Sequence, residues 1–344
     1  NVTGVLTEVA SVRIATPVEV PPSELRGGGK GLVTYGTQSN FPNPWRGGAW
    51  RLRDVMDYER VASDAIHEYC ATHRADVLRN MLAKARSAIA AAAPGEAYRV
   101  PMAQRDPAGA RALAALLVEH GVEVRGDAAG DAWIPLAQPY GRFVREMMEP
   151  QRFPEVKLVP GKDIVAPYDV TAWSLPLSMG VTAEKATLPE GLKPWAPPAA
   201  APLAAAPAYA LGPESPERWK VVSAARKGGE VSVLAAADGP LVSGTVVLDA
   251  GAAKAAAPVA GELGLALAPL AKAPAGLAKL RAPRVGLYKP WAASMDEGWT
   301  RFLLERYGFA PVTLDNAAVR AGKLGARFDV IVLPDVDREV LANG

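Results

Sequence analysis

Apolar residues recur at steps of three and four positions through residues 53–92, which is the spacing of one face of an α-helix. Pro94 and Gly95 end this pattern. We therefore predict a long helical region here, with its apolar stripe packed into a core. The stripe consists of Val55, Tyr58, Ala62, Ala65, Ile66, Tyr69, Val77, Leu78, Met81, Leu82 and Ala85.

The next pattern predicts a β-α-β unit over residues 98–124. A strand-like run at 98–103 leads to Asp106, a favoured N-cap residue, and Pro107 then stands at the first helical position. Gly121 follows the apolar helical positions, and a glycine there is typical of a helix end.

Residues 139–148 predict a short helix, and residues 166–181 form an irregular aromatic segment. Between 193 and 216, prolines become too frequent for a helix or a central strand, which predicts an Ala/Pro-rich linker. A small α/β module is expected beyond this linker. Its predicted elements are a helix at 217–227 and strands at 231–234 and 245–248.

The last stretch predicts alternating strands and helices. Ser294 and Glu297 have the spacing of a capping box, for a helix that ends at Gly308. The strand-like runs are nearly continuously apolar, as in buried parallel strands. We therefore predict an α/β fold class, with the start of a doubly wound, flavodoxin-like sheet here. The predicted strands are 285–288, 312–314 and 330–333.

Charge and composition exclude several classes of protein. The chain has 344 residues, and its 38 basic and 36 acidic side chains leave a net charge of +2, too even for a nucleic-acid binder. No apolar run approaches the ~20 residues of a membrane-spanning helix. A single cysteine excludes an internal disulfide, but this fits either redox compartment. We expect no nucleic-acid partner and no membrane span, and the oligomeric state has no readable signal.

Three motifs that suggest phosphate or metal binding fail on geometry. The Gly-rich run at 26–32 lacks a Ser or Thr after its Gly-Lys pair, so it predicts a flexible loop. His67 and His73 are six residues apart, which turns the two rings ~120° away from each other on a helix. His120 and Glu123 lie on either side of a predicted helix end, so they are not expected to share a metal ion.

Glu8 is the carboxylate that we single out. Residues 3–10 predict a short strand, in which Leu6, Glu8 and Ala10 share one face. An acid with apolar neighbours lies either at a sheet edge or in a cleft, where desolvation would raise its pKa towards that of a general base. Cys70, in contrast, falls in mid-helix, and we expect it to be a small buried side chain rather than a nucleophile.

Five sequence blocks, taken in this order, resemble large bacterial proteins of the carboxypeptidase A type zinc metallopeptidase family. Those proteins have an N-terminal zinc peptidase domain and a C-terminal domain similar to class I glutamine amidotransferases. The resemblance covers nearly the whole chain. The blocks are residues 6–18, 101–124, 136–154, 167–181 and 285–309.

The resemblance implies hydrolysis of C-terminal peptide bonds in a peptide substrate, with zinc as cofactor and Glu8 as general base. The family's zinc ligands precede that glutamate, so we expect them outside this chain and expect the chain alone to be inactive. It also implies a secreted or periplasmic protein, although no signal peptide is present in this chain. The expected parts are the end of a carboxypeptidase-like domain (1–93), an α/β connecting module (94–192), the linker (193–216), a small α/β module (217–280) and a truncated amidotransferase-like domain (281–344).

The last of these parts has its own candidate site. Ligands of open α/β sheets bind beyond the carboxyl ends of the strands, which places the loop 289–297 at such a crevice. Its plausible lining residues are Trp291, Asp296, Glu297 and Trp299. A structural role is the alternative, because Glu297 belongs to the capping box and Trp299 can pack under the sheet. No cysteine is present in this part to act as a glutaminase nucleophile.

A function of a different class is also open. The α/β modules could hold a peptide, a glycan or a partner domain without catalysis, and Glu8 would then be a spectator. The position of Glu8 separates the two hypotheses, because a general base must face a concave site that a substrate can enter.

Overall fold

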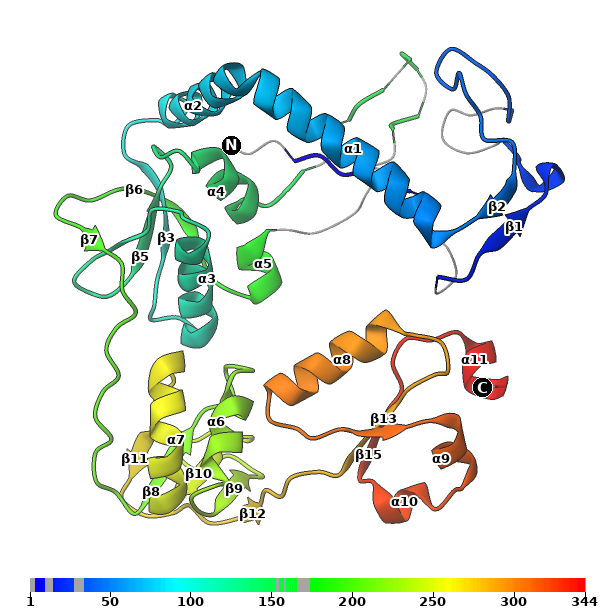
Figure 1. The fold of residues 1–344 in the computed structure, drawn as a ribbon. Coiled ribbons are helices and arrows are strands. Elements are labelled where there is room, and N and C mark those ends of the chain that lie inside the picture. Colours follow the sequence, from blue (N-terminus) through cyan, green and yellow to red (C-terminus); the bar gives the residue numbers. More distant parts are fainter. Residues whose placement is uncertain are drawn as a thin grey trace. The chain divides into compact units, whose positions relative to one another are not determined.

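The computed structural model describes residues 4–9, 15–27, 34–152, 155–157, 159–161, 163–165 and 174–343. Helices and sheets alternate along the chain, which confirms the predicted α/β class (Figure 1). The chain divides into two compact units, residues 1–87 and residues 88–344. None of the helices in the described residues has the length and hydrophobicity of a membrane-spanning segment.

The first unit consists of a small two-stranded sheet and a long helical region. Strand β1 pairs antiparallel with β2, and the aromatic ring of Trp50 lies 5.5 Å from that of Trp45 and 5.6 Å from that of Tyr58. The elements are β1 (Val18–Val20), a 3-10 helix η1 (Pro22–Glu24), β2 (Gly48–Trp50), α1 (Leu52–Thr72) and the greater part of α2 (Arg74–Ala90).

The long helical region is confirmed, but its predicted burial is wrong. No residue of α1 is buried, and Ala88 is the only buried residue of α2. Tyr58, Leu78 and Met81, for example, are each more than half exposed. Helical periodicity shows which side of a helix is apolar, but it does not show whether another element covers that side.

The first module of the second unit is a five-stranded antiparallel sheet in the order β6-β3-β5-β4-β7. Side chains of α3 and α4 share one core with alternate residues of β3 and β5, so both helices pack on the same face of the sheet. The elements are β3 (Glu96–Val100), α3 (Pro107–Glu119), β4 (Arg125–Gly126), β5 (Ala132–Pro135), α4 (Gly141–Met148), α5 (Leu175–Met179), β6 (Glu184–Thr187) and β7 (Lys193–Pro194).

The predicted ends of α3 are confirmed. The Asp106 side chain accepts a hydrogen bond from the Gly109 amide at 3.0 Å, and Gly121 has a φ of 78° after the helix. The predicted β-α-β unit is present, but β5 lies between β3 and β4 and runs antiparallel to both. This arrangement is a split β-α-β motif.

The second module has the same strand order as the first. Its sheet reads β11-β8-β10-β9-β12, so β8 takes the place of β3, β9 that of β4 and β10 that of β5. Helices α6 and α7 pack together over one face, in a core of their own. The two modules are therefore a structural repeat. The elements are β8 (Ala208–Leu211), α6 (Arg218–Ala225), β9 (Val231–Leu234), β10 (Val246–Asp249), α7 (Ala250–Leu263), β11 (Ala268–Leu270) and β12 (Leu277–Lys279).

The predicted linker at 193–216 is wrong at both ends. Lys193 and Pro194 form β7, and the next residue, Trp195, is buried in the first module. Strand β8 is buried along its whole length, although prolines flank it at 207 and 213. A strand of four residues fits between two prolines, so the overall frequency of proline did not exclude it.

The third module is a parallel sheet in the order β14-β13-β15, which confirms the predicted parallel strands. In chain order this is 2-1-3, the order in which a flavodoxin-like sheet begins. Strand β13 is buried, but β14 and β15 are largely exposed, contrary to the expectation of buried strands. The elements are β13 (Val285–Tyr288), α8 (Met295–Arg306), β14 (Val312–Leu314), α9 (Asn316–Arg320), α10 (Leu324–Arg327), β15 (Val330–Val332) and α11 (Arg338–Asn343).

Candidate functional site

Glu8 lies in an exposed, irregular segment of the first unit. Residues 4–9 belong to no strand, so the strand prediction is wrong for the described part of residues 3–10. The adjacent Thr7 hydroxyl donates a hydrogen bond of 2.6 Å to the Glu59 carboxylate, which attaches this segment to α1. Alternation of side chains indicates a strand only if another strand accepts its backbone hydrogen bonds, and none of the described strands does so here.

His67, Cys70 and His73 lie on α1 and its C-terminal cap, and His120 lies at the end of α3. His67 is exposed on α1, and the His73 ring stacks on Tyr69 with 4.4 Å between the ring centroids. His120 caps the C-terminal end of α3, as expected from the position of the helix end. Cys70 is exposed, so its predicted burial is wrong. It shares α1 with the uncovered apolar stripe.

The structure does not test the Gly-rich run, because most of residues 26–32 lie outside the described residues. The same holds for residues 166–173 of the aromatic segment. In the described ranges, no three His, Cys, Asp or Glu side chains come together in a way that could hold a metal ion.

A crevice lies where the sequence predicts one in the third module. It has a volume of about 370 Å³ and is formed by the loops that follow β13 and β15. Strand β13 lies in the middle of the sheet, with β14 on one side and β15 on the other. The chain thus changes direction across the sheet at β13, and open α/β sheets bind ligands at such a topological switch point. The lining residues are Pro290, Ala292–Asp296, Asp335–Asp337 and Val340.

Of the four predicted lining residues, only Asp296 lines this crevice. Glu297 is 7% exposed, and its carboxylate accepts a hydrogen bond of 2.8 Å from Arg301 Nε one turn further along α8. Its amide donates to the Ser294 hydroxyl at 3.2 Å, which confirms the Ser294 half of the capping box. Trp299 is largely exposed and packs edge-on against Phe302, while Trp291 is 95% exposed.

Two lining residues, Asp335 and Asp337, were not predicted from the sequence. They lie in the loop that follows β15, so the same rule about carboxyl ends of strands would have identified them. Together with Asp296 they give the crevice three carboxylates and no Lys or Arg. Such a lining disfavours an anionic ligand and favours one that is cationic or rich in hydroxyl groups.

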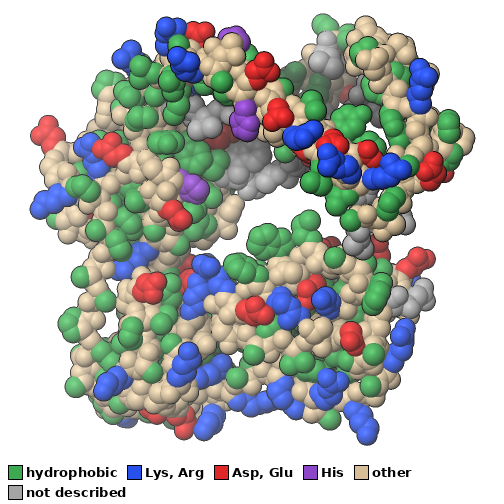
Figure 2. Space-filling view, in the orientation of Figure 1, with side chains coloured by type: hydrophobic (Ala, Val, Ile, Leu, Met, Phe, Trp, Pro, Cys, Tyr) green, Lys and Arg blue, Asp and Glu red, His purple; other side chains and the backbone are tan. Residues whose placement is uncertain are grey.

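The surface in Figure 2 carries basic and acidic side chains interspersed, as the nearly even composition implies. No protein-family model, no curated protein and no solved structure matches this chain.

Proposed function

We propose that this chain is part of a zinc-dependent metallocarboxypeptidase-like protein that hydrolyses C-terminal peptide bonds. The ordered run of five sequence blocks over residues 6–309 carries the proposal. The arrangement of a helical unit, α/β modules and the start of a 2-1-3 parallel sheet is compatible with the parts that this resemblance implies.

Zinc itself does not fit the described residues, because no suitable group of ligands is present among them. We therefore derive no step through the metal and assign the zinc ligands to residues outside this chain. Within the chain the proposal concerns Glu8. Its carboxylate is exposed to solvent and is not set in a concave site of the described residues, so residues outside this chain must form the site that a general base needs.

The first experiment measures release of the C-terminal residue from an N-blocked peptide, with and without added zinc. The 344-residue chain is expected to release none. Cleavage by this chain would overturn the assignment of the zinc ligands to residues outside it.

The second experiment uses a longer protein that contains this chain and has peptidase activity. There, Glu8→Gln is expected to lower kcat/KM by at least about 100-fold, the lower range for loss of a general base. Glu24→Gln, at another exposed glutamate of the first unit, is the matched control and is expected to keep the activity. Equal activity of the two variants would remove Glu8 from the mechanism.

The crevice of the third module favours a second candidate function, which is non-catalytic binding. Its three carboxylates suit a Lys- or Arg-containing peptide or a glycan. Asp335→Asn combined with Asp337→Asn is expected to weaken binding of a Lys-rich peptide about tenfold or more, measured by calorimetry at low salt. If the double variant binds this peptide and a panel of glycans like the original chain, the crevice is not the binding site.

A further inference from the structure

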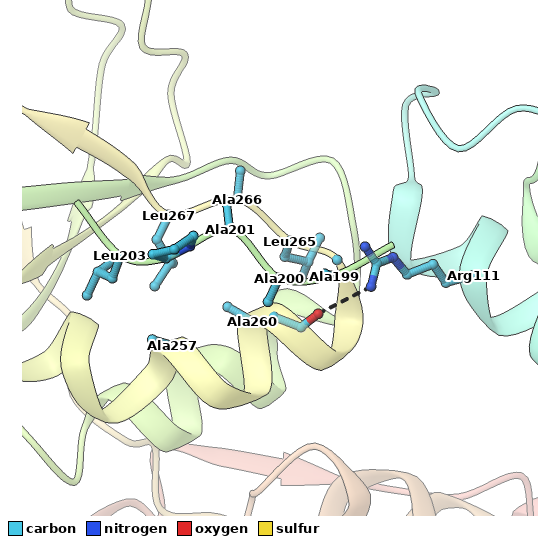
Figure 3. Close-up of a pocket in the computed structure, with 13 residues that line it drawn as sticks. Arg111, Ala199, Ala200, Ala201, Leu203, Ala257, Ala260, Leu265, Ala266 and Leu267 are labelled. Carbon is cyan, nitrogen blue, oxygen red and sulfur yellow. Dashed lines mark hydrogen bonds between the residues drawn. The ribbon is translucent and has the colours of Figure 1, made fainter. Parts of the chain in front are cut away.

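A separate cavity of about 220 Å³ lies at the junction of the first and second modules (Figure 3). Helix α7, the segment that enters β11 and the connecting segment 199–203 form its walls, and Arg111 of α3 reaches in from the first module. Apart from Arg111, every lining residue is an aliphatic side chain, a proline or a glycine. These residues are Ala199–Leu203, Ala257, Ala260, Gly261 and Gly264–Leu267.

Two glycines near the end of α7 let the walls approach each other. A Cβ atom at Gly261 would lie 2.6 Å from the Cβ atom of Ala200. At Gly264, whose φ is 72°, a Cβ atom would lie 2.2 Å from Arg111 Nε. The connecting segment and the guanidinium can therefore occupy these places only because both positions lack a side chain.

Arg111 is a half-buried cation without an acidic partner. Its Nη1 atom donates one long hydrogen bond of 3.3 Å to the Gly261 carbonyl oxygen, and no ion pair of the described residues includes it. Burial lowers the pKa of Arg111, and no neighbouring carboxylate opposes that effect. Arg99 and Arg145 of the same module, in contrast, pair with Asp131 and Glu96, which raise the pKa of each arginine.

We propose that this cavity binds a small aliphatic monocarboxylate. A guanidinium can donate two parallel hydrogen bonds to a carboxylate, and such a pair strengthens in apolar surroundings. The tail of the ligand would then contact the leucines at 203, 265 and 267. The lining offers no acidic group for an ammonium ion, which selects a simple carboxylate over a free amino acid.

The cavity also sets the size of the ligand. A cavity of this size and apolar lining suits a short aliphatic chain, so hexanoate, with about eight non-hydrogen atoms, is a suitable probe. The proposal goes beyond the peptidase function, because it involves neither Glu8 nor zinc.

The test is a titration of the whole chain with sodium hexanoate, followed by backbone amide NMR shifts. We expect saturable shifts for the amides of the non-proline residues in 199–203 and 257–267. Hexanamide has the same shape without the charge, and we expect it to bind about tenfold more weakly or worse. Arg111→Met should abolish the preference for hexanoate over hexanamide, whereas Arg105→Met, at an arginine outside this lining, should retain it.

Ala257→Leu provides a second variant, which places a larger side chain in the cavity and leaves Arg111 unchanged. We expect it to weaken hexanoate binding about tenfold, so the proposal stays testable if Arg111→Met does not fold. The proposal is wrong if hexanoate causes no saturable shifts, or if hexanamide binds equally well. In either case Arg111 serves only to join the two modules, through its bond to the end of α7.

Discussion

One helix in each repeated module begins at an aspartate. Asp106 caps α3, and Asp249 caps α7 through a hydrogen bond of 2.7 Å from the Ala252 amide. The Asp249 carboxylate also accepts a hydrogen bond of 2.8 Å from the Glu230 amide. This bond connects the start of α7 to the residue before β9. These backbone hydrogen bonds hold the pKa of Asp249 below its usual range. The carboxylate therefore joins a helix to a neighbouring strand only while it is ionised.

Asp249→Ala should lower the free energy of unfolding by about 1 kcal/mol at pH 7, the usual effect of losing an N-cap. A carboxyl group whose pKa is lower in the folded state stabilises the protein at any pH above its unfolded pKa, which is about 3.9 for aspartate. This stabilisation is lost as the pH falls through the folded pKa. The difference between the variant and the original chain should thus shrink below about pH 4. Urea unfolding at pH 7 and pH 3 measures it, with the exposed Asp238→Ala as control. An equal difference at both pH values would contradict the role of the charge.

Helix α4 depends on one close backbone approach. At its first residue, Gly141, a Cβ atom would lie 2.1 Å from the carbonyl oxygen of Leu136, the residue that follows β5. The turn from β5 into α4 can close only with glycine at this position. At Gly298 of α8, a Cβ atom would have no other atom within 4 Å, so the packing there does not require glycine.

The same substitution should therefore have opposite effects in the two helices. Gly141→Ala should lower the free energy of unfolding by about 2 kcal/mol or more, because backbone atoms must move. Gly298→Ala should raise it by up to about 1 kcal/mol, through helix propensity alone. Thermal unfolding followed by circular dichroism compares them. A mild effect of Gly141→Ala would mean that the β5–α4 turn can open.

At the scale of the whole molecule, two modules with one topology follow each other and keep separate cores. Leu113 of α3 and Leu248 of β10 are both fully buried, each in its own core. Helices α3 and α7 contact each other between the modules, and Arg111 donates a hydrogen bond there to the Gly261 carbonyl oxygen. We infer that each module unfolds as a unit of its own.

Leu113→Ala and Leu248→Ala should each destabilise one module by about 2–5 kcal/mol, the cost of a cavity in a core. Hydrogen exchange read by mass spectrometry should show faster exchange in residues 96–148 for the first variant and in 208–263 for the second. In the double variant the two effects should add. Faster exchange in both modules after a single substitution would show that they unfold together.

The sequence predicted the third module best. Its strands β13 and β14 have the predicted bounds, as does β9 of the second module, because each is a compact apolar run between turn residues. Strand β8 and helix α7 were missed, since α7 is mostly alanine and glycine with Pro258 inside and therefore has no apolar period. The repeat was missed for a related reason. The two modules have the same strand order but different sequences. Their first strands share little beyond Ala-Tyr at 97–98 and 208–209.

At the candidate sites, only general rules of topology succeeded. The crevice was predicted because strand ends in a parallel sheet always meet at one edge, but the roles of Glu297 and Trp299 depended on local partners. The Arg111 cavity could not be predicted, because its walls come from residues about 150 positions apart and only tertiary packing brings them together.

The edge strands of the three sheets in the second unit differ in how readily another strand can pair with them. The edges of the repeated modules carry proline or lysine, with Lys185 in β6, Pro194 in β7, Pro269 in β11 and Lys279 in β12. Such residues discourage a foreign strand from adding to a sheet. The edge strands β14 and β15 of the third module contain neither, and Val312, Val330 and Ile331 are exposed there. As concentration rises, we expect copies of this chain to associate first through the third module, while the repeated modules remain inert.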